Sequence, residues 1–191
     1  MSIKSNAAFI FLGLAVSSGA SAAPAPQPGF DHRLEQLVKA EPGAVQCFVR
    51  KYDRAHMANH PKQTVTAVSL CIKVAYDTLN GDGRYQYDFE MRARQRNRAK
   101  ILTSTGECGA SDAPANTIWP PSGNISCGPA CDGGEVEIQW EEKSSVLIVR
   151  LERIRMSLGC GGEEAGTVDL TGGADDRVFR LTKVPRSKAK I

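Results

Sequence analysis

The clearest pattern in the chain is a strict alternation of apolar and polar positions between residues 84 and 94. Odd positions from Tyr85 to Ala93 are apolar, and even positions from Arg84 to Arg94 are polar or charged. Successive side chains of a β-strand point to opposite faces, whereas a 3.6-residue period would scatter these aromatic residues around a helix axis. The alternation therefore predicts a long, half-buried antiparallel strand with one dry and one solvated face.

A second alternating segment, from Val65 to Tyr76, precedes this strand. The residues between the two segments include Asn80–Gly83, and this composition is typical of a tight turn because Asn and Gly tolerate positive φ. Residues 65–94 are therefore predicted to form a β-hairpin.

Weaker patterns predict the remaining elements. A capping Asp31 and the helix-ending Pro42 predict one short helix over residues 31–40. The strand expected at 146–158 changes the parity of its apolar positions, which a β-bulge near Glu152–Arg153 would correct. Further strands are expected at 44–52 (with a helix as the alternative there), 99–105, 135–141 and 178–184, and loops at 53–60 (or a helical turn), 107–123 and 165–174.

These elements together predict an all-β fold. About seven strands follow one another without intervening helices, which excludes parallel βαβ folds. The pattern favours a single antiparallel, up-and-down, barrel-like domain over residues 31–184 with one short N-terminal helix. A two-sheet β-sandwich is the alternative.

The N-terminus carries the pattern of a secretory signal. Lys4 precedes the apolar segment 7–16, and Ala-Ser-Ala ends at Ala22. We therefore expect a signal peptide at 1–22 and a flexible, proline-rich leader at 23–30, with the protein in the periplasm or secreted. The apolar segment is too short to remain as a membrane span, so the processed chain is not expected to be an integral membrane protein. A basic, frayed tail is expected at 185–191.

The six cysteines follow the predicted signal and form an even set, which is typical of disulfides in an exported protein. Their positions favour the pairs Cys47–Cys71, Cys108–Cys127 and Cys131–Cys160. A second arrangement, with Cys108–Cys131 and Cys127–Cys160, remains open.

Three segments carry a resemblance to known proteins: His56–Val65, Cys131–Gly134 and Asp175–Leu181. With them the chain resembles a group of small exported bacterial proteins of unassigned function, over residues 44–184. The resemblance implies export and a β-rich domain, and it transfers no catalytic residue.

Three sets of residues are candidates for function. Apolar side chains at the barrel interior or its mouth are the ligand-binding candidates: Tyr85, Tyr87, Phe89, Met91, Trp119 and Trp140. A basic run is the candidate contact for an anionic partner, or else a solvated strand face that discourages edge pairing: Arg92, Arg94, Arg96, Arg98 and Lys100. His56 and His60 are weak metal candidates, because Met57 stands where the zinc-protease motif requires Glu.

No motif in the chain indicates a reaction. We expect a non-enzymatic, disulfide-stabilised β-domain without a cofactor that binds a small apolar or anionic ligand, a lipid or another envelope component. Whether it has any catalytic activity is left open. The alternative is a secreted inhibitor or protein-interaction module acting through loop 107–123. The formal net charge of +3 and the scarcity of aromatic residues in the basic run do not favour nucleic acid.

Overall fold

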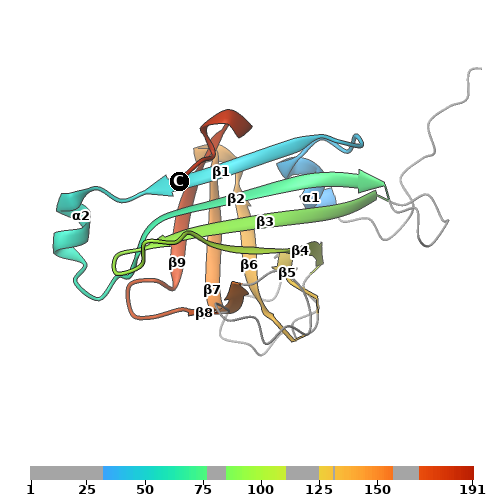
Figure 1. Cartoon of the computed structure of the whole chain (residues 1–191). Coiled ribbons are helices and arrows are strands. Elements are labelled where there is room, and N and C mark those ends of the chain that lie inside the picture. Colours follow the sequence, from blue (N-terminus) through green and yellow to red (C-terminus); the bar gives the residue numbers. More distant parts are fainter. Residues whose placement is uncertain (1–31, 77–84, 111–124, 131, 157–167) are drawn as a thin grey trace, which may run out of the picture.

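The computed structural model describes residues 32–76, 85–110, 125–130, 132–156 and 168–191 (Figure 1). Its strands are β1 (Val45–Lys51), β2 (Val65–Tyr76), β3 (Tyr85–Gln95), β4 (Leu102–Ala110), β5 (Ile125–Gly128), β6 (Gly134–Glu141), β7 (Val146–Met156), β8 (Val168–Thr171) and β9 (Val178–Val184). The helices in these ranges are α1 (His32–Leu37) and α2 (Arg54–Asn59), with 3-10 turns η1 (Glu142–Ser144) and η2 (Arg186–Lys188).

The described strands form one antiparallel sheet in the order β6-β5-β4-β3-β2-β1-β9-β7-β8, and a β6–β7 pairing closes it. The closed barrel has eight strands, because β8 pairs only with the far end of β7. The all-β barrel prediction is therefore confirmed, and the single closed sheet does not fit the sandwich alternative. In Figure 1 the long strands β1 to β3 pass across β6, β7 and β9.

The predicted hairpin is present as β2 and β3, which pair from Val65 opposite Gln95 to Tyr76 opposite Tyr85. The predicted bulge is also present, because Val136 lies opposite Leu151 while Glu135 lies opposite Arg153. Glu152 is the extra residue, and it lets Leu151 and Ile154 both point into the core.

Strand β5, at Ile125–Gly128, was not predicted, and the structure differs from the prediction in two further segments. Strand β4 begins later than the expected strand at 99–105 and continues into the predicted loop 107–123, as far as Ala110. Strand β8 lies inside the predicted loop 165–174. Neither segment has a long apolar alternation. Tertiary pairing, of β4 with β5 and of β8 with β7, makes them strands.

Apolar side chains from all the barrel strands form one buried cluster. Helix α1 contributes Leu34 and Leu37, and the following Val38 joins them. These three side chains are buried together with the barrel core, so α1 covers an end of the barrel. At the C-terminus, η2 packs near β1 and Ala189 is buried, so the predicted tail is folded against the barrel and is not frayed.

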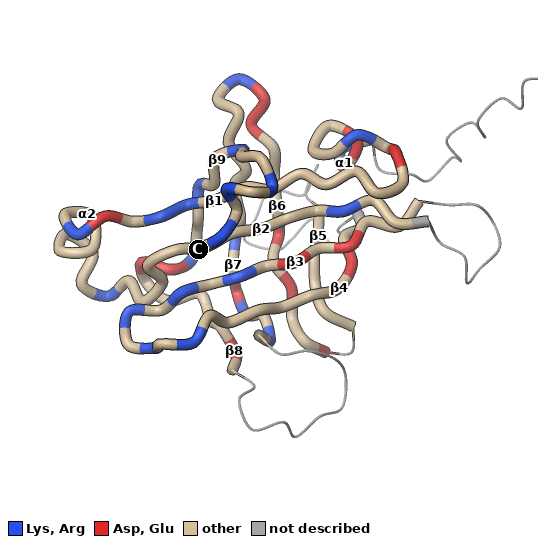
Figure 2. The backbone as a smooth tube through the Cα atoms, turned by 45° about the horizontal axis from the view of Figure 1, so that its top comes forward, with Lys and Arg blue, Asp and Glu red and all other residues tan. Residues whose placement is uncertain are grey.

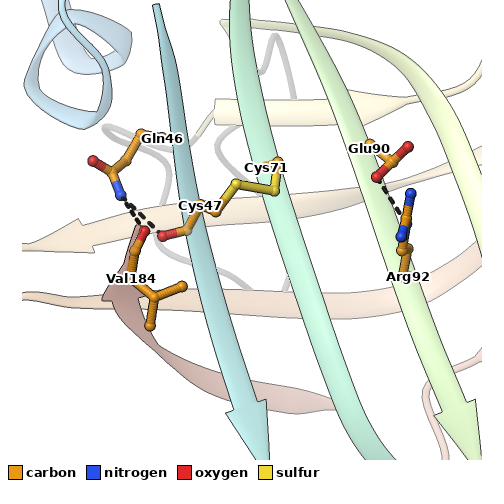
Figure 3. The surroundings of a disulfide bond; sticks show 6 residues. All are labelled: Gln46, Cys47, Cys71, Glu90, Arg92 and Val184. Carbon is orange, nitrogen blue, oxygen red and sulfur yellow. Dashed lines mark hydrogen bonds and ion pairs between the residues drawn. A yellow bond between two sulfur atoms is a disulfide. The ribbon is translucent and has the colours of Figure 1, made fainter. Parts of the chain in front are cut away.

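Two predicted disulfides are confirmed in the described residues: Cys47–Cys71 joins β1 to β2, and Cys108–Cys127 joins β4 to β5. In both, the cysteines lie directly opposite each other on neighbouring strands. Figure 3 shows the first pair beside the β1–β9 pairing, which we call the seam, where Gln46 donates a hydrogen bond to the Val184 carbonyl. Disulfides fit a protein of an oxidising compartment. Cys131 and Cys160 lie outside the described residues.

Candidate functional site

The predicted interior residues are part of the barrel core. Tyr87, Phe89 and Met91 are 2%, 3% and 0% exposed, while Tyr85 and Trp140 pack against the core from partly buried positions. A cavity that admits water would give its lining atoms accessible surface. These three β3 side chains therefore act as packing, and ligand binding by this set stays a prediction. Trp119 and most of loop 107–123 lie outside the described residues.

The basic run does not form one strand face, because β3 ends at Gln95 and the chain then turns. Arg92 is ion-paired with Glu90 at 2.8 Å on the outside of β3 (Figure 3). The other four residues lie at the end of β3 and in the β3–β4 connection, and we call them the basic turn: Arg94, Arg96, Arg98 and Lys100. Figure 2 shows this turn at the same end of the barrel as α2.

The basic turn is joined to α2 by Arg96. Its guanidinium donates to the carbonyl oxygens of Met57, at 2.9 Å, and His60, at 3.4 Å. Met57 lies in the last turn of α2, where helix carbonyls lack intrahelical partners, and His60 is the C-cap residue of the helix. Arg96 therefore fixes the C-terminal end of α2 against the barrel.

Beside α2 lies an open groove of about 710 Å³ between the end of β1 and β9. We call it the rim groove. Its lining consists of Arg50, Tyr52, His56, His60, Gln63, Val146, Ala174, Asp175, Arg177, Val178, Arg180 and Thr182. This volume is within the range of about 300–1,000 Å³ that is usual for ligand sites.

One wall of the rim groove is an aromatic stack. The rings of Tyr52 and His56 lie 4.5 Å apart, and those of His56 and His60 lie 4.3 Å apart, both nearly parallel. The stack is held because the Asp53 carboxylate caps α2 by accepting the His56 backbone N–H at 2.7 Å. The His56 ring Nε2 also lies 2.9 Å from the Gln63 amide oxygen, so it carries the proton in that hydrogen bond.

Gln63 fixes the orientation of the His56 ring through hydrogen bonds of its side-chain amide. Its side-chain amide nitrogen donates to the Val65 carbonyl at 2.7 Å, which leaves the amide oxygen to accept from His56. Burial raises the pKa of Tyr52 above its usual value, although the nearby Arg50 guanidinium opposes the rise. Tyr52 is therefore a neutral phenol near pH 7, with Arg50 placed 5.1 Å from its ring centroid in a cation–π contact.

The opposite wall is positioned by a buried carboxylate. Asp176 is 2% exposed and accepts three hydrogen bonds: from the Thr64 backbone N–H and hydroxyl, both at 2.6 Å, and from the Val65 N–H at 3.1 Å. These bonds join the β8–β9 connection to the start of β2. They set the position of the neighbours of Asp176, Asp175 and Arg177, which line the rim groove.

The third arginine of the groove, Arg180, forms an ion pair with a carboxylate that is not part of the groove lining. Its guanidinium lies 2.6 Å from the Glu141 carboxylate. This hydrogen bond, with a second one from the Ser144 hydroxyl, lowers the pKa of Glu141. Arg50 and Arg177 have no carboxylate partner among the described residues, so two guanidinium groups of the groove remain available to an anion.

The geometry of the two predicted histidines does not favour a shared metal ion. The lone pair of an imidazole lies in the ring plane, so the parallel stacking of His56 and His60 does not aim their nitrogens at one point. Within the described ranges, no group of three or more His, Cys, Asp or Glu side chains is placed to hold a metal ion. In the same ranges, no helix has the length and apolarity that a membrane crossing requires.

Sequence reasoning missed the principal residues of the rim groove: Arg50, Tyr52, Arg177 and Arg180. They belong to strands or connections more than a hundred positions apart, and only the closure of β1 against β9 brings them together. Two of the three segments that carry the predicted resemblance, His56–Val65 and Asp175–Leu181, contain residues of the groove lining.

Comparison with known proteins adds no relative. No protein-family model matches the chain, and no curated protein and no solved structure shows significant similarity to it. The resemblance to small exported bacterial proteins therefore stays a prediction.

Proposed function

We propose that the protein is an exported, non-enzymatic β-barrel, stabilised by disulfides, that binds an anionic ligand in the rim groove. The observation that carries the proposal is the set of three guanidinium groups, Arg50, Arg177 and Arg180, against a single lining carboxylate, Asp175. Guanidinium groups keep their charge at any physiological pH and donate several hydrogen bonds in one plane, which suits carboxylate and phosphate groups.

The packed interior favours the rim as the place of binding. The largest core side chains, such as Phe48 and Phe179, have no accessible surface, so the barrel centre offers no room to an apolar ligand there. The rim groove has both charge and an aromatic wall. Arginine does not exchange protons in proteins, so the dominant groups of the groove serve binding better than acid–base catalysis.

The basic turn supports the same proposal. Its Arg96 contacts α2, whose histidines line the groove, and Arg94, Arg98 and Lys100 form no ion pair with described residues. Such a cluster raises the local concentration of anions and their association rate. We propose export to the periplasm or beyond because of the predicted signal at 1–22 and the two cross-strand disulfides.

Calorimetric titration of the exported, purified protein with citrate and with inorganic phosphate tests the proposal. We expect saturable binding that weakens with added salt. The double variant Arg50→Gln/Arg177→Gln is expected to bind at least tenfold more weakly, since each lost charge-assisted hydrogen bond is worth about 1.5–3 kcal/mol.

The matched control is Lys190→Gln, which removes an exposed charge outside the groove. It should bind like the parent protein. Equal affinities for the double variant and the parent would place any anion site elsewhere, and no heat with either probe would reject binding of simple anions.

A further inference from the structure

One of the strand pairings that complete the barrel, between β1 and β9, is short. Strands β1 and β9 pair only at residues 47–49 and 182–184. Beyond Val49, β1 stays with β2, as shown by the hydrogen bond from the Tyr52 N–H to the Thr66 carbonyl at 2.9 Å. Strand β9 continues along β7 as far as Val178. The two strands therefore diverge, and the rim groove occupies the space between them.

The divergence leaves part of β9 as an open strand edge. The Leu151 N–H donates to the Arg177 carbonyl at 2.9 Å, so residue 177 turns its backbone groups toward β7. In an antiparallel pair this orientation alternates, and residues 179 and 181 also face β7. Val178 and Arg180 consequently present their N–H and C=O groups to the rim groove.

These backbone groups have no partner among the described residues, since the β1 pairing begins only at Thr182. Two donors and two acceptors alternate along one line. A simple anion can accept from the two N–H groups and leaves both carbonyl oxygens unpaired. An extended peptide backbone satisfies both kinds of group, as in strand addition to a sheet edge.

The side chains around this edge specify the character of such a peptide. Val178 is 44% exposed, which is unusual for a large apolar residue, and Val146, opposite Thr182, is a second apolar residue of the groove lining. Arg50, Arg177 and Arg180 surround the same edge. Alternate side chains of an added strand point to opposite sides, so acidic residues at every second position could reach the guanidinium groups while smaller residues pack near Val178.

We infer that the ligand of the rim groove is an extended acidic peptide segment that adds to β9 as a strand at Val178–Leu181. This inference rests on the proposed function and names the class of its ligand. The peptide supplies main-chain hydrogen bonds to Val178 and Arg180, and its carboxylates face the arginines of the groove.

The test uses a blocked peptide, acetyl-Thr-Glu-Val-Glu-Thr-Glu-amide, titrated into the exported protein by calorimetry. Two analogues of identical charge, N-methylated on the three Glu or on the other three residues, cannot donate along one backbone edge. We expect the parent peptide to bind and at least one analogue to bind tenfold more weakly. The Arg180 amide should exchange with solvent more slowly when the peptide is bound.

A protein variant tests the same edge from the other side. Val178→Pro removes the N–H that faces the groove without removing a barrel hydrogen bond, and proline is tolerated at such strand edges. We expect Val178→Pro to lose peptide affinity at least tenfold. Val178→Ala, which retains the N–H, should stay within about threefold of the parent, as expected from a small lost apolar contact.

The outcomes separate the two proposals. Citrate binding without peptide binding, or equal affinity for the peptide and both analogues, would overturn strand addition and leave the anion site standing. Absence of binding for citrate, phosphate and peptide would overturn both. Should Val178→Pro fail to fold, the N-methylated analogues and the amide exchange of Arg180 decide the matter.

Discussion

At the scale of single residues, the most consequential side chain is the buried carboxylate of Asp176. Carboxylates are rarely buried without compensation, and here three donors surround one group. The same three bonds hold the β8–β9 connection against the first residues of β2. Asp176 therefore joins two segments 111 or more positions apart in the chain and fixes one wall of the rim groove.

Asp176→Asn is expected to lower the free energy of unfolding by about 2–3 kcal/mol, because an amide nitrogen would face backbone donors and one charged acceptor is lost. Urea unfolding followed by tryptophan fluorescence measures the change. Asp175→Asn is the matched control at the next position, where the half-buried carboxylate has no described hydrogen bond, and it should stay within about 0.5 kcal/mol. Similar losses in the two variants would contradict the structural role given to Asp176.

At the scale of elements, the sequence predicted what depends on local alternation. The β2–β3 hairpin and the bulge at Glu152 follow from the parity of apolar positions, and both are confirmed. Strands β4 and β8 were missed in part or in whole, because their segments become strands only by pairing with β5 and β7. The rim groove was missed for the same reason, since no local pattern records which strands close a barrel.

Opposite the bulge, on the edge of β7 that faces β8 and β9, the chain also leaves the sheet for a few residues. Strands β8 and β9 lie along that edge one after the other, and the chain leaves it at Gly172 and returns at Arg177. The Gly172 N–H donates to the Glu152 carbonyl at 2.8 Å. The N–H of Leu151, the preceding residue of β7, donates to the Arg177 carbonyl at 2.9 Å. The connection therefore departs from and returns to adjacent residues of β7.

Gly172→Ala is expected to destabilise the protein by about 1–3 kcal/mol, because a Cβ at this position would overlap the carbonyl oxygen of Leu151. Gly173→Ala is the control in the same connection, where a Cβ would meet no atom within 4 Å. Its unfolding free energy should stay within about 0.5 kcal/mol of the parent value. Thermal and urea unfolding of the pair measure the difference, and equal stability of the two variants would contradict the close approach at Gly172.

At the scale of the whole molecule, the two disulfides of the described residues lie away from the part of the β1–β9 boundary where the strands are unpaired. Cys47–Cys71 ties β1 to β2 at the level where β1 also pairs with β9, and Cys108–Cys127 ties β4 to β5. The barrel is thus reinforced between β1 and β2 and between β4 and β5, while β9 is held by hydrogen bonds and core packing. Phe179 and Leu181 supply that packing from the inner face of β9.

Reduction of both disulfides is expected to lower the stability of the barrel markedly. The bonded cysteines are 24 and 19 positions apart, and the loop-entropy relation for such separations gives about 3 kcal/mol for each bond. Cys47→Ala/Cys71→Ala and Cys108→Ala/Cys127→Ala should each show a loss of this size in urea unfolding. Unchanged midpoints after reduction would contradict a stabilising role.

The β8–β9 connection between Gly172 and Arg177, here called the excursion, is a place where such a barrel could change its binding specificity. Because both of its ends attach to neighbouring β7 residues, extra residues placed between the exposed Gly173 and Ala174 would not shift the register of any strand. The excursion could therefore lengthen, shorten or exchange its sequence, in nature or by design, while the frame beneath it stays the same. The barrel would then keep its structure while the connection between Gly172 and Arg177 varies.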